Sequence, residues 1–212
     1  MDLNVINTFF KFITISLLYC TLVGCAKEKD PLIMQTIELK RGPPSARFSI
    51  PNAYRLRANS NQVVSLTVKY PSMKPEDPNL SPLINAVSIY ITLGSGIGRI
   101  EKMVSRAATE FNPSLPGKAF YAGQEEEYKI YRIGRDPSRN DTYETKTYVF
   151  KATDGALVGV TDIGNSSNLC DAFRKFGTDI DIHYLIPKQL GKDFKKIDDK
   201  VLEFLKNHII LE

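Results

Sequence analysis

Apolar and polar residues alternate along several stretches of the chain, which is the pattern of β-strands that bury one face. Two rows are long enough to predict strands on their own, with apolar members Val64, Leu66, Val68 and Tyr70 in the first and Val87, Ile89, Ile91 and Leu93 in the second. Shorter runs predict strands around residues 48–50, 127–133 and 180–186. Asp154-Gly155 lies between two further β-rich runs, 145–153 and 156–163, and predicts a hairpin because this dipeptide tolerates the positive φ values of a tight turn.

Two stretches have the period of a helix instead. Over residues 99–110 the apolar side chains fall on one helical face, and Asn112-Pro113 ends the pattern. Near the C-terminus a second amphipathic helix is predicted from Phe194, Ile197, Val201, Phe204 and Leu205. The expected fold class is therefore α+β: an antiparallel sheet with an internal helix and a C-terminal amphipathic helix.

Composition narrows the class of protein without naming an activity. The chain has 212 residues, 42% of them hydrophobic, which is enough for one packed domain. The formal net charge is +4 and charges of both signs are interspersed, so no basic run predicts nucleic-acid binding. His occurs only at positions 183 and 208, and no residue pattern predicts a metal ion or another cofactor.

The N-terminal segment has the pattern of a secretion signal. Residues 12–24 carry no charge, and the run is shorter than the roughly 20 apolar residues that a membrane-spanning helix needs. The segment closes with Leu22-Val23-Gly24-Cys25, and the charged stretch Lys27-Glu28-Lys29-Asp30 follows. The alternative is a buried N-terminal helix with a chance Gly-Cys, but the segment shows no polar face and its switch to charged residues is abrupt.

This ending resembles the lipobox of bacterial lipoproteins, in which an aliphatic residue, a small or branched one and Gly or Ala precede the lipidated Cys. The resemblance implies that residues 1–24 are removed as a signal peptide and that Cys25 carries the lipid. It further implies that residues 25–35 are the lipidated Cys and a tether, and that 36–212 form a single α+β domain. In that family Ala26 at the next position implies the outer membrane of a Gram-negative bacterium, with the domain facing the periplasm.

Four features of the sequence could carry chemistry, and each has a simpler structural interpretation that we favour. Gly94-Ser95-Gly96-Ile97-Gly98 precedes the 99–110 helix and could bind phosphate, but its spacing fits neither the dinucleotide fingerprint nor the P-loop. Asp179, Asp181 and His183 would share one face of a strand, either as ligands or as a solvated polar row. Glu125-Glu126-Glu127 and the basic face of Arg99, Lys102 and Arg106 are typical of solvated surface.

Two loops, 71–82 and 134–142, are the expected contact regions for a protein partner. The first holds four prolines and the second is longer than a simple hairpin requires, and long loops in compact domains are often functional. The candidate partner-binding residues in these loops are Met73, Lys74, Glu76, Asp77, Arg135, Asp136, Arg139 and Asn140.

The layout is also similar to the immunity lipoproteins that protect bacteria from phospholipase effectors of type VI secretion. The shared features are the lipobox, one α+β domain of this size, and the segments Phe48-Ser49-Ile50-Pro51-Asn52-Ala53-Tyr54 and Val68-Lys69-Tyr70-Pro71-Ser72-Met73-Lys74-Pro75. This resemblance implies a non-enzymatic protein that binds a toxic lipase and occludes its active site. The alternatives are a structural or assembly lipoprotein of the cell envelope and, less favoured because no nucleophile–base pair can be identified, a lipid-anchored hydrolase.

Overall fold

The computed structural model describes residues 30–40, 45–60, 63–75, 85–94, 96–109, 118–133, 145–164 and 167–211. These residues belong, apart from Asp30, to one compact unit that spans Pro31–Glu212. The predicted signal peptide, the lipobox Leu22-Val23-Gly24-Cys25 and the first residues of the tether lie outside the described residues.

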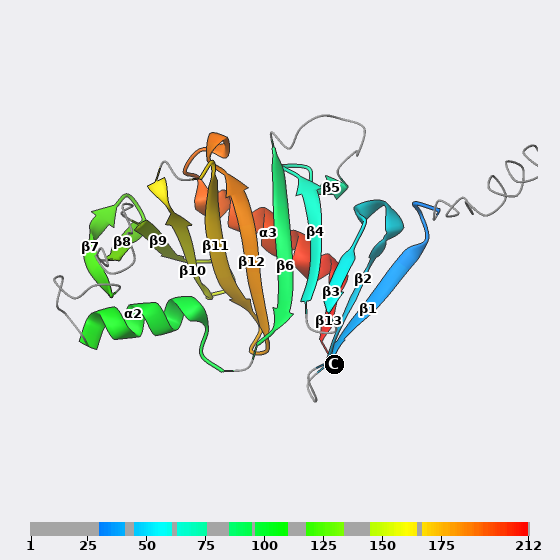
Figure 1. Ribbon diagram of the computed structural model, residues 1–212, viewed down its shortest axis with the longest axis horizontal. Helices are drawn as coiled ribbons and strands as arrows, with labels where there is room; N and C mark the ends of the chain where they lie inside the picture. Colours follow the sequence, from blue (N-terminus) through cyan, green and yellow to red (C-terminus); the bar gives the residue numbers. More distant parts are fainter. Residues whose placement is uncertain are drawn as a thin grey trace, which may run out of the picture. The chain divides into compact units, whose positions relative to one another are not determined.

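A ten-stranded antiparallel sheet dominates this unit (Figure 1). Its strands follow the order β3-β4-β6-β12-β11-β10-β9-β8-β7, and β5 pairs with β4 beside this path. Strand β12, late in the chain, pairs with β6 on one side and β11 on the other, so it joins the two halves of the sheet. The strands are β3 (Arg57–Ser60), β4 (Val63–Lys69), β5 (Lys74–Pro75), β6 (Ala86–Leu93), β7 (Ala119–Glu125), β8 (Tyr128–Ile133), β9 (Thr145–Lys151), β10 (Leu157–Asp162), β11 (Leu169–Phe176) and β12 (Ile180–Pro187).

A second, three-stranded sheet joins the two ends of the unit. It has the order β1-β2-β13, with β1 at Met34–Lys40, β2 at Ser45–Pro51 and β13 at Ile209–Leu211. The short 3-10 helix η1 (Asn52–Tyr54) follows β2 and is hydrogen-bonded to the segment that precedes β1. The amide of Ala53 donates to the carbonyl of Pro31 at 3.1 Å, and the amide of Asn52 donates to that of Ile33 at 2.9 Å.

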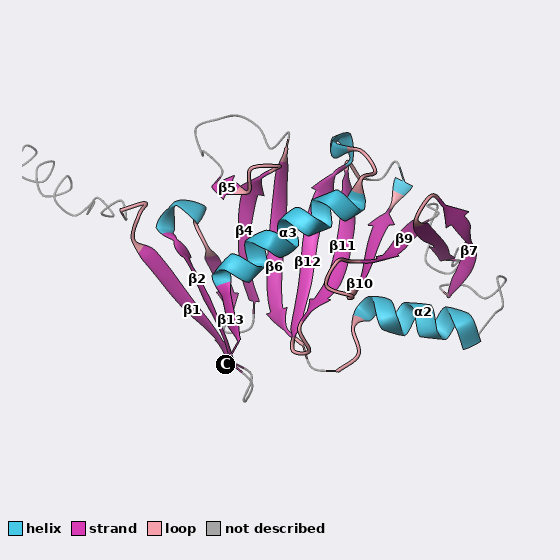
Figure 2. Ribbon diagram, turned by 180° about the vertical axis from the view of Figure 1, so that it is seen from behind, coloured by secondary structure: helices cyan, strands magenta, loops and turns pink. Residues whose placement is uncertain are grey.

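The two longer helices lie against opposite faces of the large sheet. Helix α3 (Phe194–His208) crosses the strands obliquely, as Figure 2 shows, and Asp193 caps its start by accepting a hydrogen bond from the amide of Lys196. Helix α2 (Arg99–Thr109) connects β6 to β7. A second 3-10 helix, η4 (Lys188–Leu190), leads from β12 toward α3. Within the described residues, neither helix is long and apolar enough to cross a bilayer.

The α3 face of the sheet holds the main hydrophobic core. Alternate residues of β4, β6 and β12 point into it, as the strict alternation of buried and half-buried positions in β6 and β12 indicates. The small sheet contributes Phe48 and Ile50 to this same core, and α3 contributes its buried stripe. The side chains of this core that are least accessible to solvent include Val64, Val68, Val87, Ile89, Ile91, Ile180, Ile186, Val201 and Leu205.

The α2 face is packed over only part of its area. A smaller cluster joins Ile100 and Ala107 of α2 to Tyr131 and Val149 of the sheet. Gly159 on β10 allows the close approach of the helix, because a Cβ there would lie 2.3 Å from Cδ1 of Ile100. The remainder of this face carries polar and aromatic side chains of β4, β6, β11 and β12.

The structure confirms both predicted helices, the 145–163 hairpin and the predicted strands. The fold is an antiparallel sheet with two helices, and it contains more strands than we expected. Gly155, in the hairpin turn, has φ 87°. Six strands were not predicted: β1, β3, β5, β7, β11 and β13. Strand β1 begins at Met34 and is anchored through Pro31 and Ile33, so the fold begins before residue 36, where we expected the domain to start.

Candidate functional site

The turn after β4 holds the predicted contact residues that the structure describes. Met73 has a positive φ of 52°, and its amide donates a hydrogen bond to the carbonyl of Lys69 at 2.8 Å. Its side chain is only 7% exposed and belongs to the main core, so Met73 supports the turn from below instead of presenting its side chain to a partner. Lys74 is exposed at the surface of the same turn.

The other candidate contact residues cannot be placed in the fold. Glu76 and Asp77 follow β5, and Arg135, Asp136, Arg139 and Asn140 fall between β8 and β9; all six lie outside the described residues.

A small hollow of about 220 Å³ lies between this turn and the C-terminal half of α3. Tyr54 forms one wall: its hydroxyl donates to the carbonyl of Met73 at 3.1 Å, and its ring contacts Phe204 and His208. Nδ1 of His208 donates to the carbonyl of Ser49 at 3.1 Å, and burial lowers the pKa of this imidazole below its usual 6.5. The exposed side chains of Lys200 and Glu203 form the rim, 2.9 Å apart as an ion pair.

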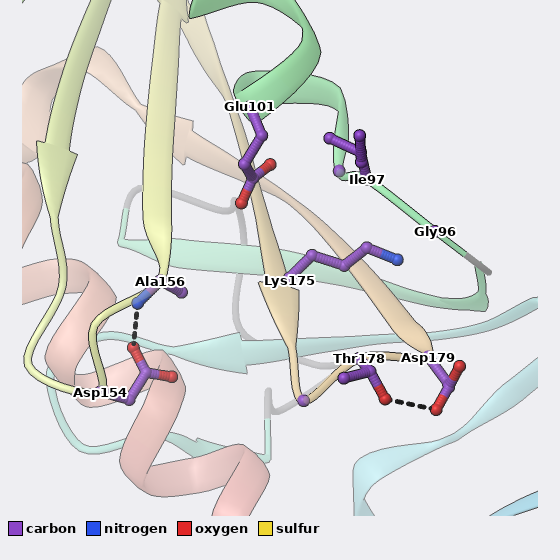
Figure 3. Close-up of a pocket in the computed structure, with 10 residues that line it drawn as sticks. Gly96, Ile97, Glu101, Asp154, Ala156, Lys175, Thr178 and Asp179 are labelled. Carbon is purple, nitrogen blue, oxygen red and sulfur yellow. Dashed lines mark hydrogen bonds between the residues drawn. The ribbon is translucent and has the colours of Figure 1, made fainter. Parts of the chain in front are cut away.

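A larger open hollow, of about 630 Å³, lies beside the glycine-rich segment before α2 (Figure 3). The structure brings together residues that are distant in sequence: Gly96 and Ile97, Glu101 of α2, the hairpin turn at Asp154, and Lys175, Thr178 and Asp179 around the β11–β12 turn. Two of the segments singled out in the sequence, 94–98 and 179–183, therefore meet at one place.

The polar groups of this hollow are engaged within the fold. Nζ of Lys175 donates to the carbonyl of Gly94 at 2.7 Å and lies 3.0 Å from Oδ1 of Asp181. Oγ1 of Thr178 donates to Oδ2 of the neighbouring Asp179 at 2.5 Å. Gly94 leaves room for the Asp181 carboxylate, because a Cβ at Gly94 would lie 1.6 Å from Oδ2 of Asp181 and would force that side chain to move. These contacts hold the β11–β12 turn against the end of β6.

The N-terminus of α2 lies beside a carboxylate from its own first turn, that of Glu101. Glu101 lies in the first turn, and Gly98 accommodates it, since a Cβ at Gly98 would lie 2.2 Å from Oε2 of Glu101. A carboxylate at this position satisfies the partial positive charge of the helix N-terminus, which a bound phosphate would otherwise use. The geometry therefore favours the interpretation of residues 94–98 as a connection.

Asp181 and His183 lie on the polar face of β12, as the alternation predicted, but each pairs with a different neighbour. Nε2 of His183 lies 2.9 Å from Oδ1 of Asp171, whereas Asp181 pairs with Lys175. The His183 ring stacks on Phe173 with 4.4 Å between centroids and on Tyr90 at 5.3 Å. Within the part of the chain that the structure describes, no group of three or more His, Cys, Asp or Glu side chains could hold a metal ion.

The aromatic stack runs across three strands and ends under α2. Tyr90 of β6, His183 of β12 and Phe173 of β11 are directly opposite one another in the register of the sheet. The guanidinium of Arg99 lies 4.0 Å from the Phe173 ring centroid, a cation–π contact that covers the end of the stack. Arg99 therefore does not belong to a purely solvated basic face, as the sequence suggested.

The acidic run at 125–127 forms surface ion pairs. Glu125 pairs with Lys146 of β9, which lowers the pKa of the carboxyl, and Oε2 of Glu127 lies 2.7 Å from Nζ of Lys195. Both glutamates are exposed, so the run is a solvated turn whose charges are matched inside the unit.

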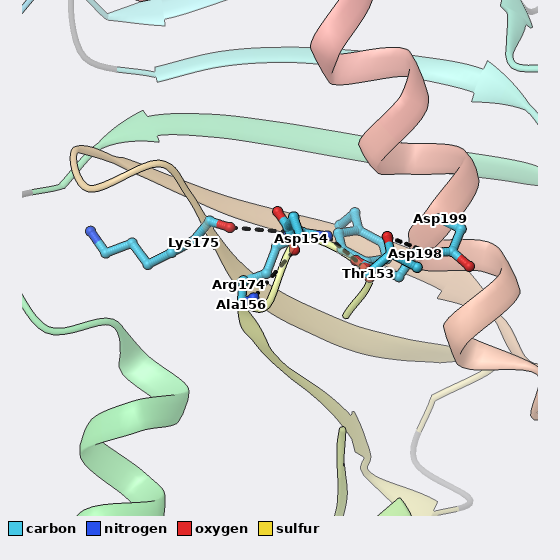
Figure 4. Close-up of polar contacts among 8 residues, drawn as sticks. Thr153, Asp154, Ala156, Arg174, Lys175, Asp198 and Asp199 are labelled. Carbon is cyan, nitrogen blue, oxygen red and sulfur yellow. Dashed lines mark hydrogen bonds and ion pairs between the residues drawn. The ribbon is translucent and has the colours of Figure 1, made fainter. Parts of the chain in front are cut away.

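A buried charge cluster, which the sequence interpretation did not identify, lies behind the large hollow (Figure 4). The Arg174 guanidinium and the Asp198 carboxylate are both fully buried, and their nearest atoms are 2.5 Å apart. The Tyr184 hydroxyl donates to Asp198 at 2.7 Å, and Asp154 in the hairpin turn also pairs with Arg174. Burial raises the pKa of Asp198, and the guanidinium and the hydroxyl both oppose that rise.

This cluster fastens three elements together. Arg174 comes from β11, Asp198 from α3 and Asp154 from the β9–β10 turn, so the pairings tie the helix and the hairpin to the middle of the sheet. A signal was present in the sequence: Phe194, Asp198, Val201 and Leu205 are spaced by four, three and four, which places a carboxylate in the apolar stripe. A charge at such a position indicates a buried partner.

Comparisons with known proteins give a distant structural similarity. No family model matches the chain, and a search of curated proteins finds no match. Among solved structures, the chain is similar to the iron-regulated outer membrane lipoprotein FrpD of Neisseria meningitidis. The superposition covers 82% of this chain and 92% of that one, with 13% sequence identity and a TM-score of 0.46.

Proposed function

We propose that the protein is a lipid-anchored component of the bacterial cell envelope that acts by binding a protein partner and not by turnover. The anchor would be Cys25, at the end of the lipobox Leu22-Val23-Gly24-Cys25. Within this class we propose the immunity role: the domain faces the periplasm, binds a toxic phospholipase effector and blocks its active site.

The observation that supports the binding role is that polar groups around the larger of the two hollows described above are engaged within the fold. Of the lining side chains, Lys175 contacts Gly94 and Asp181, and Asp154 pairs with Arg174. A catalytic base or nucleophile needs a lone pair directed at the substrate, and a catalytic acid needs a proton there. The protons and lone pairs of these groups are instead used in hydrogen bonds and ion pairs within the fold. A rigid surface of this kind supports recognition by shape and charge.

The turn at Lys74 and the neighbouring hollow are the contact surface that we propose. Lys200 and Glu203 offer exposed charges at the rim, with the rings of Tyr54 and Phe204 also lining the hollow, and Lys74 is exposed in the adjoining turn. Aromatic rings surrounded by polar groups are the usual composition of the centre of a protein interface. The core residue Met73 would keep the turn in position from below.

The test uses the full chain and the lipase-like effector encoded beside it, if the gene neighbourhood contains one. The purified protein is expected to co-purify with the effector and to abolish its phospholipase activity at a one-to-one ratio, while showing no esterase activity of its own. The variant Lys74→Glu, at an exposed position, is expected to weaken binding, whereas Lys102→Glu on exposed α2 serves as the matched control.

Several outcomes would overturn the proposal. Failure of the wild-type protein to bind or inhibit that effector, or the lack of such a neighbour, would remove the immunity role. Ester hydrolysis by the purified protein alone would replace binding with catalysis.

A further inference from the structure

Three consecutive large apolar side chains are exposed at the start of the fold. Leu32 is 83% exposed, Ile33 57% and Met34 53%. The other large exposed hydrophobics among the described residues, Ile97, Tyr121 and Leu169, are scattered over separate elements. Single exposed apolar residues are ordinary, but a contiguous group is the mark of an interaction surface.

This apolar patch, Leu32–Met34, is held in place by the body of the fold. The carbonyls on either side of Leu32, those of Pro31 and Ile33, accept hydrogen bonds from Ala53 and Asn52 of η1, and Met34 pairs with Pro51 in the small sheet. The patch is therefore fixed before it meets a partner, and burying its side chains costs little backbone entropy.

Chain length places the patch within reach of the proposed anchor. Leu32 follows Cys25 by seven positions, and seven residues extend at most about 25 Å. A lipid on Cys25 would thus keep the patch within a short distance of the bilayer at all times. Two exposed arginines, Arg55 directly after η1 and Arg57 in β3, belong to the segment that follows η1, and their positive charge complements the negative charge of anionic lipid headgroups.

We propose that the side chains of Leu32, Ile33 and Met34 insert into the interface of the bilayer to which Cys25 is attached. This contact sets the orientation of the domain relative to the membrane. The inference rests on the proposed lipidation of Cys25. Exposed apolar side chains together with basic ones are the composition of segments that lie in the membrane interface. With the patch against the lipid, the domain cannot rotate freely on its tether, and one end of it always faces the bilayer.

The experiment places a fluorescent label at the patch and at a matched site. Ile33→Cys and Ile97→Cys are made in the full chain, since both isoleucines are exposed and Ile97 lies in the segment between β6 and α2, outside the small sheet that begins at the patch. Each protein is purified from membranes, labelled with an environment-sensitive maleimide and reconstituted into vesicles of phosphatidylethanolamine and phosphatidylglycerol that contain a nitroxide-labelled lipid.

The native thiols make the labelling selective. Cys170 is 3% exposed, and burial raises its pKa to about 11, so it does not react in the folded protein. A thioether-linked Cys25 has no free thiol, whereas an unmodified Cys25 would take up maleimide in the parent protein. The same labelling, together with the mass of the N-terminal peptide, therefore tests the lipidation separately.

Interface insertion should give blue-shifted emission at position 33 and quenching about threefold or more stronger than at position 97, because such segments lie about 5–10 Å into the headgroup region. Replacing Arg55 and Arg57 by Gln should reduce that difference. Equal quenching at the two positions in an acylated protein would overturn the patch inference and leave the lipoprotein proposal intact. A shift at position 33 that depends on protein concentration would assign the patch to a second copy of the chain and also overturn it. An unacylated Cys25 would overturn both.

Discussion

The two faces of the ten-stranded sheet are built on different principles. On the α3 face, residues of the central strands are close to fully buried, and the charged groups there, Arg174 and Asp198, are buried with them. On the α2 face, the helix covers only one part of the sheet, and the rest carries half-exposed polar and aromatic side chains such as His183 and Asp171. Ion pairs occur on both faces, so the difference lies in how much water surrounds them.

This difference indicates which face of the sheet contributes more to the stability of the fold. A charge pair that is removed from water must stay complete, because loss of one member leaves the other charged and unsolvated. A pair that keeps contact with water loses little when one member is removed. Substitutions of charged residues on the α3 face should therefore destabilise the fold, whereas substitutions on the open part of the α2 face should cost little.

The largest expected effect comes from breaking the buried cluster. Asp198→Ala removes the fully buried one of the two carboxylates that pair with Arg174, and also the acceptor of Tyr184, and we expect it to lower the free energy of unfolding by about 3–5 kcal/mol. Asp171→Ala, on the other face, breaks the contact with His183, in which the two side chains are 29% and 35% exposed, and should cost less than about 1 kcal/mol. Urea denaturation measures both values, and similar losses for the two variants would refute the contrast.

A combined variant sharpens this prediction. Changing Arg174, Tyr184 and Asp198 together to Met, Phe and Leu removes every charge of the buried group except that of Asp154, which is 22% exposed. Because apolar packing often replaces a buried ion pair without loss, we expect the triple variant to recover most of the stability lost by Asp198→Ala. No recovery in the same denaturation experiment would mean that the cluster fixes the position of α3 in a way that packing cannot replace.

The next effect in size concerns apolar side chains of one strand that point to opposite faces. Ile182→Ala, at a position only 1% exposed under α3, should cost about 2–5 kcal/mol, because it leaves a cavity in the core. Leu185→Ala, in the same strand but on the half-exposed face, should cost clearly less. Thermal unfolding monitored by circular dichroism compares the two directly, and the reverse order would show that the α2 face is the better packed one.

A smaller effect is expected where α2 docks. Gly159→Ala introduces a Cβ that would lie 2.3 Å from Cδ1 of Ile100, so the helix must shift outward. We expect a loss of about 1–3 kcal/mol from this overpacking. Shortening the facing residue, as Ile100→Val in the Gly159→Ala background, should restore part of it, and a double-mutant cycle tests that coupling.

The smallest effect is a pH dependence on the α3 side. Burial lowers the pKa of His208 below the 6.5 of the unfolded chain, so between the two values the unfolded state binds more protons. The contribution of this ring is fully present above pH 6.5 and is lost as the pH falls toward its folded pKa. Unfolding free energies measured from pH 8 to pH 5 should fall less steeply for His208→Gln than for the wild type, and parallel curves would contradict this assignment.

Much of the fold could be predicted from periodicity because the central strands obey it. Strands β4 and β6 have uninterrupted apolar rows, and the 145–163 hairpin has its turn dipeptide at the right place. Strand β11 was missed because its buried row, Cys170, Ala172, Arg174 and Phe176, contains a charge and two small residues. Strand β13 was missed because its apolar residues directly continue the pattern of α3.

The sequence located the polar segments of the candidate site but not their partners. It placed Asp181 and His183 on one face correctly, yet the choice of Lys175 and Asp171 as their partners depends on the register of β11 against β12. Register between strands is set by the whole sheet and cannot be counted from one strand alone. For the same reason the meeting of Gly96 with the hairpin turn at Asp154 could not be foreseen.

The pairing of β13 with β2 has a consequence for how the molecule is made. Phe48 lies opposite Ile209, so on the side away from β1 strand β2 receives its neighbour from a segment far later in the chain. Until residues 209–211 are in place, the backbone groups of β2 on that side have no strand partner. During that interval β2 is an open edge that can pair with another chain. Deleting β13 would make that exposure permanent, and we expect the shortened protein to aggregate.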